Sequence, residues 1–330
     1  MDRLTSIVVL HYNRPKDLAL CLDSILRNTS VPFEIILVDN GSTDPDAKRY
    51  IRALEYVTLI DLPKNIVPER AASKAIAIAA GTYIVGMSDD IITTPGWLES
   101  LIKHIEKNPA IGLIGPRSNF VSGPQMVQSA RYADISELDK FAISWREENA
   151  GRLTPYSRLV GFCWFCRREL IDKIGSLDPS FGFGFSDDDF SFRANLAGFK
   201  TAIAQDVFIH HTGGPQGKGD THYQKMLAEA WSKFKKKWGL PPELPLNEYR
   251  PKALLNRPFD PNRDYVPLPD PRDVEPYIYR KAQPNYPISP VVSAHTTSRC
   301  TSAVPAKAMA NGLAAYYLGR MNEAVEIFRE

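Results

Sequence analysis

Two adjacent carboxylates follow an apolar run at residues 83–90 (YIVGMSDD), and such a run is typical of a buried strand. Asp89 and Asp90 could hold a hard divalent cation, because Mg²⁺ and Mn²⁺ take one or two protein carboxylates and fill their other positions with phosphate oxygens and water. A solvated turn after a strand is the plainer interpretation of an isolated Asp-Asp pair. The other polar clusters of the chain favour the metal interpretation.

A second cluster lies at residues 181–193 (FGFGFSDDDFSFR), where a glycine-aromatic loop leads into three consecutive carboxylates at the start of a predicted helix. The helix macrodipole favours acids in a first turn, so one or two of these residues could serve as caps. Three carboxylates behind an aromatic loop exceed what capping needs. The cluster is therefore a second candidate for chemistry.

A third cluster is the pair His210 and His211, which ends a predicted strand before a glycine turn. Alternation along a strand points the two imidazoles to opposite faces, so only one can reach an ion, and an imidazole ligand would favour Mn²⁺ over Mg²⁺. Two exposed loop histidines are the alternative. Residues 214–220 (GPQGKGD) come next and are a candidate lid over a ligand, with Lys218 as the residue that would contact it.

The elements that must position these clusters alternate between strands and helices, which predicts a parallel or mixed sheet covered on both faces. Strands are expected over 6–10, 33–38, 56–60 and 83–88, with helices over 15–26, 70–80 and 95–107. Ligands of such folds bind where the carboxyl ends of the strands converge. The polar residues expected at these ends are His11, Tyr12, Asn13, Asp39, Asp89 and Asp90.

The chain has 330 residues, 44% hydrophobic and 24% charged, which fits a soluble protein with one large domain and an appendage. A formal net charge of +2 is too small to indicate a nucleic-acid partner. The four cysteines show no disulfide framework, and Cys163 and Cys166 lie in an apolar run, so buried free thiols are expected. No apolar stretch is long enough to span a membrane. We expect a cytoplasmic protein, with the inner face of the membrane as an alternative.

Five ordered motifs resemble family 2 glycosyltransferases of the GT-A fold. The resemblance covers about residues 5–240 and is specific for the superfamily, but not for the donor or the acceptor. It implies a nucleotide-diphospho-sugar transferase fold, with a mixed, mostly parallel central sheet flanked by helices. The residues that carry it are 8–15 (VVLHYNRP), 33–44 (FEIILVDNGSTD), Asn65, 81–90 (GTYIVGMSDD) and 95–98 (PGWL).

The resemblance implies roles for individual residues. Asp187 would be the general base that deprotonates the acceptor, while Asp90 and His211 would bind the metal. Asp39 would accept a hydrogen bond from the base of the nucleotide. Residues implied to bind the nucleotide sugar are His11, Tyr12, Asn13, Asp39, Ser42, Asn65, Arg70 and Asp89. Residues expected near the acceptor or in the lid are Trp164, Asp188, Asp189, His210 and Lys218, with the core as an equal alternative for Trp164 and helix support the favoured role of Asp189.

Two positions depart from the family pattern. Ser88 stands where the family often has an acid or amide, and Ser186 stands where it usually has Glu. These departures leave open an alternative, a non-catalytic module that binds a nucleotide sugar and recruits partners. A nucleotidyltransferase is a weaker alternative, because residues 11–15 (HYNRP) do not form a glycine-rich and basic phosphate loop.

The C-terminal third has a different composition. Half of the 26 prolines fall between residues 241 and 290, which excludes long helices and predicts an extended linker over 241–300. From residue 303 the pattern turns helical and resembles the start of a tetratricopeptide repeat, with a plain helical hairpin as the alternative. One repeat cannot bury its own apolar face, so further repeats in a longer parent protein would fit this pattern. The predicted domains are therefore 1–240, 241–300 and 301–330.

The sequence as a whole predicts an inverting glycosyltransferase. It would move a sugar from a nucleotide-diphosphate donor of the UDP, GDP or dTDP type to a hydroxyl of a glycan or protein, with Mn²⁺ or Mg²⁺ as cofactor. The repeat-like tail adds a protein partner to this hypothesis.

Overall fold

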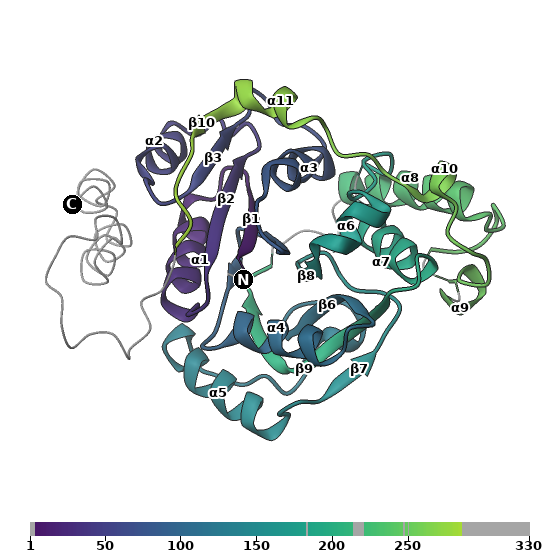
Figure 1. Ribbon diagram of the computed structural model, residues 1–330, viewed down its shortest axis with the longest axis horizontal. Helices are drawn as coiled ribbons and strands as arrows, with labels where there is room; N and C mark the ends of the chain where they lie inside the picture. The colour runs from purple at the N-terminus through teal and green to yellow at the C-terminus, as the bar shows by residue number, and fades with distance from the viewer. Residues whose placement is uncertain (1–3, 183, 214–220, 247, 250, 286–330) are drawn as a thin grey trace, which may run out of the picture.

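A computed structural model describes residues 4–182, 184–213, 221–246, 248–249 and 251–285. Its main feature is a central mixed sheet with the strand order β10-β3-β2-β1-β4-β8-β6-β9-β5, and β7 pairs with β9 outside this path (Figure 1). The strands are β1 (Thr5–His11), β2 (Phe33–Asp39), β3 (Thr58–Asp61), β4 (Tyr83–Ser88), β5 (Ile91–Ile92), β6 (Ile111–Ser118), β7 (Leu153–Pro155), β8 (Cys163–Arg167), β9 (Lys200–His211) and β10 (Ile278–Arg280).

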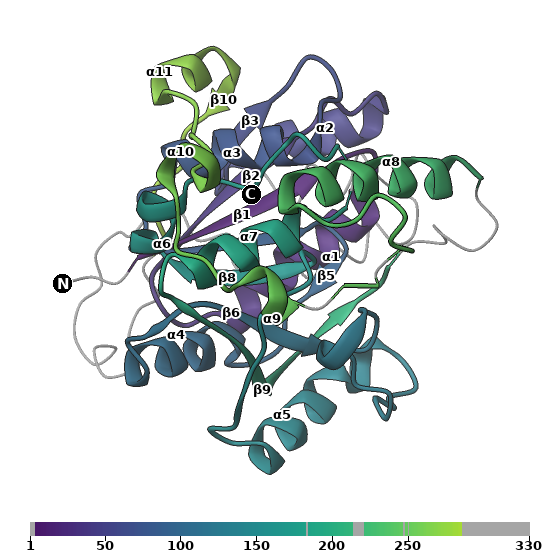
Figure 2. The ribbon, with the colours of Figure 1, turned by 90° about the vertical axis from the view of Figure 1, so that its right-hand side faces the viewer.

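Helices cover both faces of the sheet (Figure 2). Alternate residues of each strand point to opposite faces, so Ile7 packs in one core cluster with α1, α2 and α4, and Val8 packs in the other with α3, α6 and α7. The helices are α1 (Pro15–Asn28), α2 (Pro45–Ala53), α3 (Pro68–Ile78), α4 (Trp97–Lys107), α5 (Leu138–Glu148), α6 (Arg168–Ile174), α7 (Ser186–Leu196), α8 (Thr221–Trp238), α9 (Pro251–Leu254), α10 (Pro261–Asp264) and α11 (Pro271–Val274).

The register of the parallel strands brings the predicted polar ends together. His11 lies beside Asp39 on β2, and Leu10 lies beside Ser88 on β4, so these three strands end at one edge of the sheet. β8 then pairs antiparallel with both β4 and β6, which makes the sheet mixed. The predicted fold class, a mixed and mostly parallel sheet flanked by helices, is confirmed.

The proline-rich part of the chain packs on the domain as far as it is described. We call residues 251–285 the strap. Its strand β10 pairs antiparallel with β3, and Asn285 forms a bridge with Phe33. Val274 is fully buried in the cluster that contains α3. Figure 1 shows the strap crossing the outside of α3 and continuing along β3. The predicted extended linker therefore contains short helices and a sheet strand, while the domain boundaries stay a prediction.

Gly175 allows the strap to approach the domain closely. Its φ of +74° lies in the left-handed region, and an added Cβ would stand 1.7 Å from the carbonyl oxygen of Val266. We expect Gly175→Ala to lower the free energy of unfolding by about 1–3 kcal/mol, through backbone strain and overpacking. Chemical denaturation measures this change. Gly198→Ala is the control, because Gly198 also has a positive φ but nothing lies within 4 Å of its added Cβ. Equal losses for both variants would contradict the close approach.

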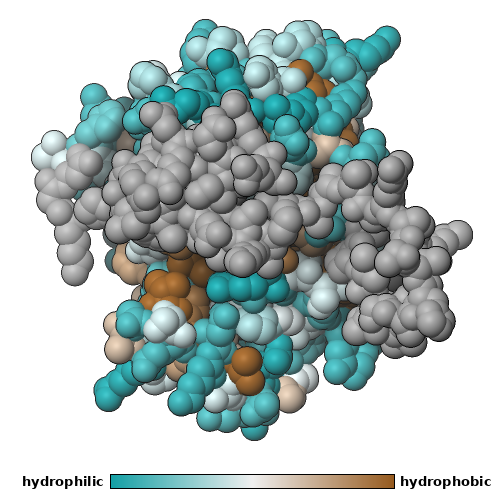
Figure 3. Space-filling model, turned by 90° about the vertical axis from the view of Figure 1, so that its left-hand side faces the viewer, coloured by the Kyte–Doolittle hydropathy of each residue, from teal (hydrophilic) through white to brown (hydrophobic). Residues whose placement is uncertain are grey.

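Several predictions concern residues outside the described ranges: Lys218 and its loop, and the helical hairpin over 301–330. Within the described part, no helix is long and apolar enough to cross a membrane. Cys21, Cys163 and Cys166 are buried free thiols, as predicted. On the face drawn in Figure 3, hydrophobic side chains form small patches on a largely hydrophilic surface, apart from the area covered by grey residues.

Candidate functional site

Asp90 and His211 lie side by side at the carboxyl edge of the sheet. The two-residue strand β5 follows Asp90 directly and pairs antiparallel with the end of β9, so that Ile91 lies opposite His211. This pairing brings His211 Nε2 to 3.4 Å from Asp90 Oδ2. Two side chains far apart in the sequence therefore lie next to each other at this edge, as expected if they bind the same ion.

Asp90 is held as a carboxylate by its neighbours. The Ser88 hydroxyl donates to Oδ1 at 2.6 Å, and Arg14 Nη1 lies 3.0 Å from Oδ2. Burial by itself would raise the pKa of Asp90, but the hydrogen bond and charge of His211, with smaller contributions from Ser88 and Arg14, hold the pKa well below its ordinary value. Asp90 therefore stays negative at every physiological pH.

The donor set at this position fits a divalent cation that also binds phosphate. His211 Nδ1 is 2.6 Å from the carbonyl oxygen of Phe120, so Nδ1 donates to that oxygen and Nε2 is the ring nitrogen that faces Asp90. A cation held here would take the place of the hydrogen that Nε2 donates to Asp90. In the described part of the chain, no group of three or more His, Cys, Asp or Glu side chains could hold a metal. Two protein ligands leave most coordination positions to diphosphate oxygens and water, which is the usual arrangement for Mg²⁺ or Mn²⁺ on a nucleotide.

His210 points away from this position. Its Nδ1 lies 2.5 Å from the Tyr132 hydroxyl, and its ring contacts the Tyr132 ring edge-on at 5.8 Å. Burial lowers the pKa of His210. The alternation predicted for the two histidines is therefore present, and His211 is the one beside Asp90.

Asp89 pairs with His11 instead of joining Asp90. Its Oδ2 lies 2.7 Å from His11 Nδ1, and the two side chains are 7% and 0% exposed. Burial raises the pKa of Asp89, and the hydrogen bond from His11 opposes this shift. The Nε2 atom of His11 is buried and has no partner among the described residues. Both residues lie under the predicted nucleotide site, at the ends of β1 and β4.

Hydrogen bonds connect the loop after β1 to the loop after β2. The Asn13 side chain accepts hydrogen bonds from the amides of Thr43 and Asp44, and Ser42 Oγ accepts one from the Asn13 amide. Asn13 has a φ of +54°, and Asn tolerates this left-handed conformation better than most residues. Tyr12, the residue before Asn13, has 42% of its surface exposed, so its ring is open to a ligand.

Asp39 ends β2 inside the domain. It is fully buried, with one carboxylate oxygen accepting from the Ser42 amide at 3.0 Å and the other from Lys48. Lys48 also lies 2.5 Å from Asp61. These contacts let the Asp39 side chain hold the Asn40–Thr43 turn. Its hydrogen bond with the base of a nucleotide stays a prediction.

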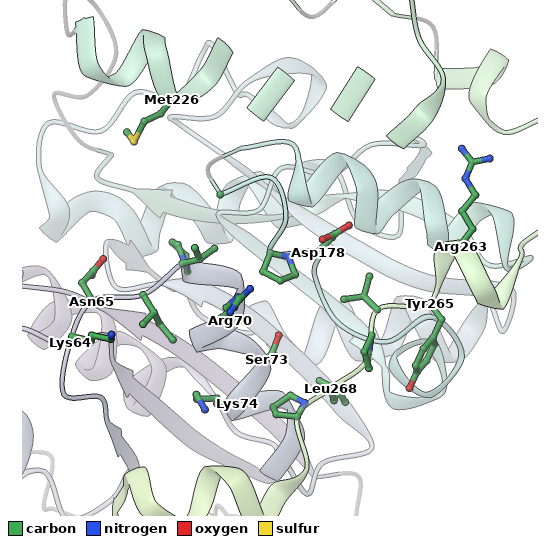
Figure 4. A pocket seen from close by; sticks show the side chains of 18 residues that line it. Lys64, Asn65, Arg70, Ser73, Lys74, Asp178, Met226, Arg263, Tyr265 and Leu268 are labelled. Atoms are coloured by element: carbon green, nitrogen blue, oxygen red, sulfur yellow. The ribbon is translucent and has the colours of Figure 1, made fainter. Parts of the chain in front are cut away.

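Asn65 and Arg70 lie on a large cavity of about 1330 Å³ between α3, the loop 178–182 and the strap. Asn65 Nδ2 donates to the carbonyl oxygen of Asn40 at 3.0 Å, which links this cavity to the end of β2. Figure 4 shows Arg70 in the middle of the lining residues, with Asn65 and Lys64 on one side and Arg263 and Tyr265 on the other. The predicted nucleotide contacts of Asn65 and Arg70 therefore point to this end of the cavity.

A short link connects Asp187 to the Asp90–His211 pair. Asp187 Oδ2 accepts a hydrogen bond from the Gly161 amide at 2.8 Å. The next residue, Phe162, stacks on the His211 imidazole at 5.4 Å between centroids, and its carbonyl oxygen accepts from the Ser88 amide at 3.2 Å. One dipeptide thus contacts the candidate base, the histidine and the strand that carries Asp90. The predicted catalytic and metal residues share one region.

The other two carboxylates of the cluster are buried in ion pairs. Asp188 Oδ1 lies 2.6 Å from Arg158 Nε and also accepts from the Tyr249 hydroxyl. Burial, followed by the charge of Asp187, raises the pKa of Asp188, while the charge of Arg158 opposes this shift. Asp189 is fully buried and pairs with Arg193 and Lys237, so it ties α7 to α8. The helix support favoured for Asp189 matches its contacts, and the place of Asp188 near an acceptor stays a prediction.

Trp164 belongs to the core. It is 5% exposed, its ring contacts Phe190 at 5.3 Å between centroids, and a Cβ added at Gly86 would lie 2.3 Å from it. The core alternative therefore describes this residue, and the ring offers no free face to an acceptor sugar.

Three residues of the site were missed by sequence reasoning: Arg14, Glu69 and Arg158. Arg14 lies inside the first motif, so its closeness to Asp90 could have been found from the shared strand ends. Glu69 accepts a hydrogen bond from the Ser186 hydroxyl at 2.6 Å, and Arg158 pairs with Asp188. Neither of these contacts has a local signal, because each joins segments 30 or more residues apart.

Comparisons with known proteins agree with this geometry. A family model described as "Glycosyl transferase family 2" matches residues 6–175. The O-antigen biosynthesis protein RfbC of Myxococcus xanthus is 28% identical over an alignment of 224 residues, and the match covers 62% of this chain and only 17% of that protein. The N-acetylglucosaminyl-diphospho-decaprenol L-rhamnosyltransferase of Mycobacterium tuberculosis is 22% identical over an alignment of 246 residues, and the match covers 66% of this chain and 79% of that protein.

The fold also occurs in a solved structure, the mannosyltransferase PcManGT from Pyrobaculum calidifontis in complex with GDP-Man and Mn²⁺. The TM-score is 0.53 at 18% identity, and the match covers 98% of this chain and 86% of the other.

Proposed function

Because the chain belongs to glycosyl transferase family 2, we propose that it transfers a sugar from a nucleotide-diphosphate donor to an acceptor hydroxyl with inversion. Asp187 is the general base, and Asp90 and His211 hold a divalent cation. The observation that carries this proposal is the link through Gly161 and Phe162, which keeps Asp187 beside the Asp90–His211 pair without placing it among the ligands.

The residues divide the reaction between two ends of the sugar. A cation at Asp90 and His211 would act as a Lewis acid on the leaving diphosphate. Arg14, 3.0 Å from Asp90, adds positive charge on the same side. Asp187 takes the proton of the acceptor hydroxyl as that oxygen attacks the anomeric carbon from the face opposite the diphosphate, and this attack inverts the centre.

The donor would lie across the ends of β1, β2 and β4. Tyr12 offers an exposed ring on which a base could stack, and the cavity end with Asn65 and Arg70 offers an amide and a cation. The buried pair His11–Asp89 supports the floor below the ribose or the sugar. A UDP, GDP or dTDP sugar fits this proposal, and PcManGT is a relative in fold that was solved with GDP-Man and Mn²⁺.

We propose a glycan as the acceptor, and the two relatives support this choice because their names concern an O-antigen and a lipid-linked saccharide. A protein acceptor is the other proposal. The predicted domains, 1–240, 241–300 and 301–330, are proposed as the working division of the chain.

A ligand screen tests the proposal. Thermal unfolding is measured with UDP, GDP, dTDP and CDP, each with and without Mn²⁺. We expect one nucleotide to stabilise the protein only when Mn²⁺ is present, because Asp90 and His211 bind the diphosphate through the cation. At a nucleotide concentration 100 times the dissociation constant, the gain is about 2.7 kcal/mol. Equal stabilisation by all four nucleotides without metal would contradict the proposal.

A further inference from the structure

Glu69 is a buried carboxylate for which the reaction described above has no use. It lies in the first turn of α3 and is 7% exposed. Its Oε1 accepts a hydrogen bond from Ser186 Oγ at 2.6 Å, and its Oε2 is buried with no partner among the described residues. Burying a carboxylate with one oxygen unpaired costs free energy, so such a residue is poorly explained by stability alone.

The contact between Glu69 and Ser186 joins two helices 117 positions apart, at the point where the base is presented. Ser186 is the first residue of α7, and Asp187 follows it directly. Phe185 before it has a φ of +61°, so the backbone enters α7 through a left-handed residue. A hydrogen bond at Ser186 fixes the rotation of this first turn, and hence the direction in which Asp187 points.

The surroundings of Glu69 disfavour its ionised form. Burial raises the pKa of Glu69, and the nearby charges of Asp187 and Asp178 raise it further, while the hydrogen bond from Ser186 lowers it. Asp178 is itself paired with Lys237. The charge of Asp187 also raises the pKa values of Arg158 and Asp188, and Asp187 Oδ1 accepts a hydrogen bond from the Asp188 amide at 3.1 Å. A hydrogen bond with the Glu69 backbone also lowers the pKa of Glu69, after that of Ser186. Ser186 is the side-chain donor to Glu69.

We propose that Glu69 is a positioning residue for Asp187: it holds Ser186 from α3 and thereby sets the first turn of α7 for proton removal. The proposal rests on the role of Asp187 given above. It predicts an effect on the rate of transfer and none on donor or metal binding, because Glu69 contacts neither Asp90 nor His211.

Alanine variants of the two partners give the first test. Glu69→Ala and Ser186→Ala should each lower kcat by about 10- to 100-fold, because a displacement of about 1 Å of a catalytic group costs up to about 100-fold. The KM for the donor and the Mn²⁺-dependent thermal shift should stay as in the wild type. Glu69→Gln should keep most of kcat, because its amide oxygen can still accept from Ser186. Equal losses of kcat and donor affinity would overturn the proposal.

The chain offers a matched control. Glu99 on α4 also has a buried, unpartnered Oε2, and its Oε1 accepts from the Ser30 hydroxyl at 2.7 Å. Glu99→Ala removes the same kind of Glu-Ser contact away from α7, so it should leave kcat unchanged. A loss of kcat in Glu99→Ala as large as that in Glu69→Ala would overturn the proposal.

A swap of the two partners completes the test. The double variant Glu69→Ser with Ser186→Glu keeps a hydrogen bond between a serine hydroxyl and a glutamate carboxylate across the two helices. The donor then lies on α3 and the acceptor on α7. Hydrogen exchange of the amides at the start of α7 should rise in Glu69→Ala and Ser186→Ala, and it should return towards the wild-type rate in the swap and in Glu69→Gln. Unchanged exchange in both alanine variants would overturn the proposal. Hydrogen exchange needs no substrate, so it tests the contact between Glu69 and Ser186 even if no transfer is detected. A failure to detect transfer would count against the proposed function alone.

Discussion

Replacing Asp187 with Asn is expected to lower kcat for sugar transfer by about 10²- to 10⁴-fold, which is the usual contribution of a positioned general base. The amide oxygen of Asn can still accept the hydrogen bond that the Gly161 amide donates to Asp187, so the local structure should persist. An amide cannot take the proton of the attacking hydroxyl. Transfer is measured with the nucleotide sugar that the thermal screen selects, at saturating donor.

Nucleotide binding gives the internal check for this variant. The Mn²⁺-dependent thermal shift of Asp187→Asn should match that of the wild type, because Asp187 is not among the proposed cation ligands. Asp172→Asn serves as the control, since Asp172 is an exposed carboxylate on α6. Transfer by Asp187→Asn at the wild-type rate would exclude Asp187 as the base and would direct attention to the non-catalytic alternative.

The second large effect is expected at the cation site. Asp90→Asn removes the charge that the cation needs, and we expect it to abolish the Mn²⁺-dependent part of nucleotide binding. A Lewis acid at a leaving diphosphate is worth several kcal/mol, so transfer should fall by at least about 100-fold. The Ser88 hydroxyl can still donate to the amide oxygen of Asn, which makes Asn a milder change than Ala. Calorimetric titration of Mn²⁺ in the presence of nucleotide measures the loss.

Neighbouring histidines provide a matched pair for the same site. His211→Ala should weaken Mn²⁺ binding, because Nε2 is turned towards Asp90. His210→Ala should leave it unchanged, because His210 faces Tyr132 on the other side of β9. If both histidine variants bind Mn²⁺ like the wild type, Asp90 alone remains as a ligand and the proposed site is wrong in that part.

Much of the fold could be predicted from the sequence because its signals are local. The spacing of Leu18, Leu22 and Ile25 predicts a helix with one buried face, and all three are fully buried on α1. The end of β4 could be predicted in the same way, because an apolar run that stops at Asp89 and Asp90 indicates where a buried strand reaches the edge of the sheet. The rule that parallel strands converge at their carboxyl ends then placed Asp90 near the end of β1 without any structure.

The details that could not be predicted all depend on contacts between distant segments. Lys48 on α2 donates to Asp39, and no local pattern indicates that this side chain turns inwards to the end of β2. Trp164 has the same sequence context whether it lies in the core or on an acceptor. The prolines after residue 240 exclude long helices, but they do not indicate that β10 pairs with β3. That strand lies more than 200 positions earlier in the sequence.

The strap has a practical consequence for any shortened form of this protein. Thr58–Asp61 would be the last strand on its side of the sheet if β10 were removed, with a row of free amide and carbonyl groups turned to solvent. Such a row is a template for pairing between molecules. A chain cut after Trp238 keeps Asp90, Asp187 and His211 but loses this cover, so it would tend to self-associate through β3 and precipitate while its chemistry is intact.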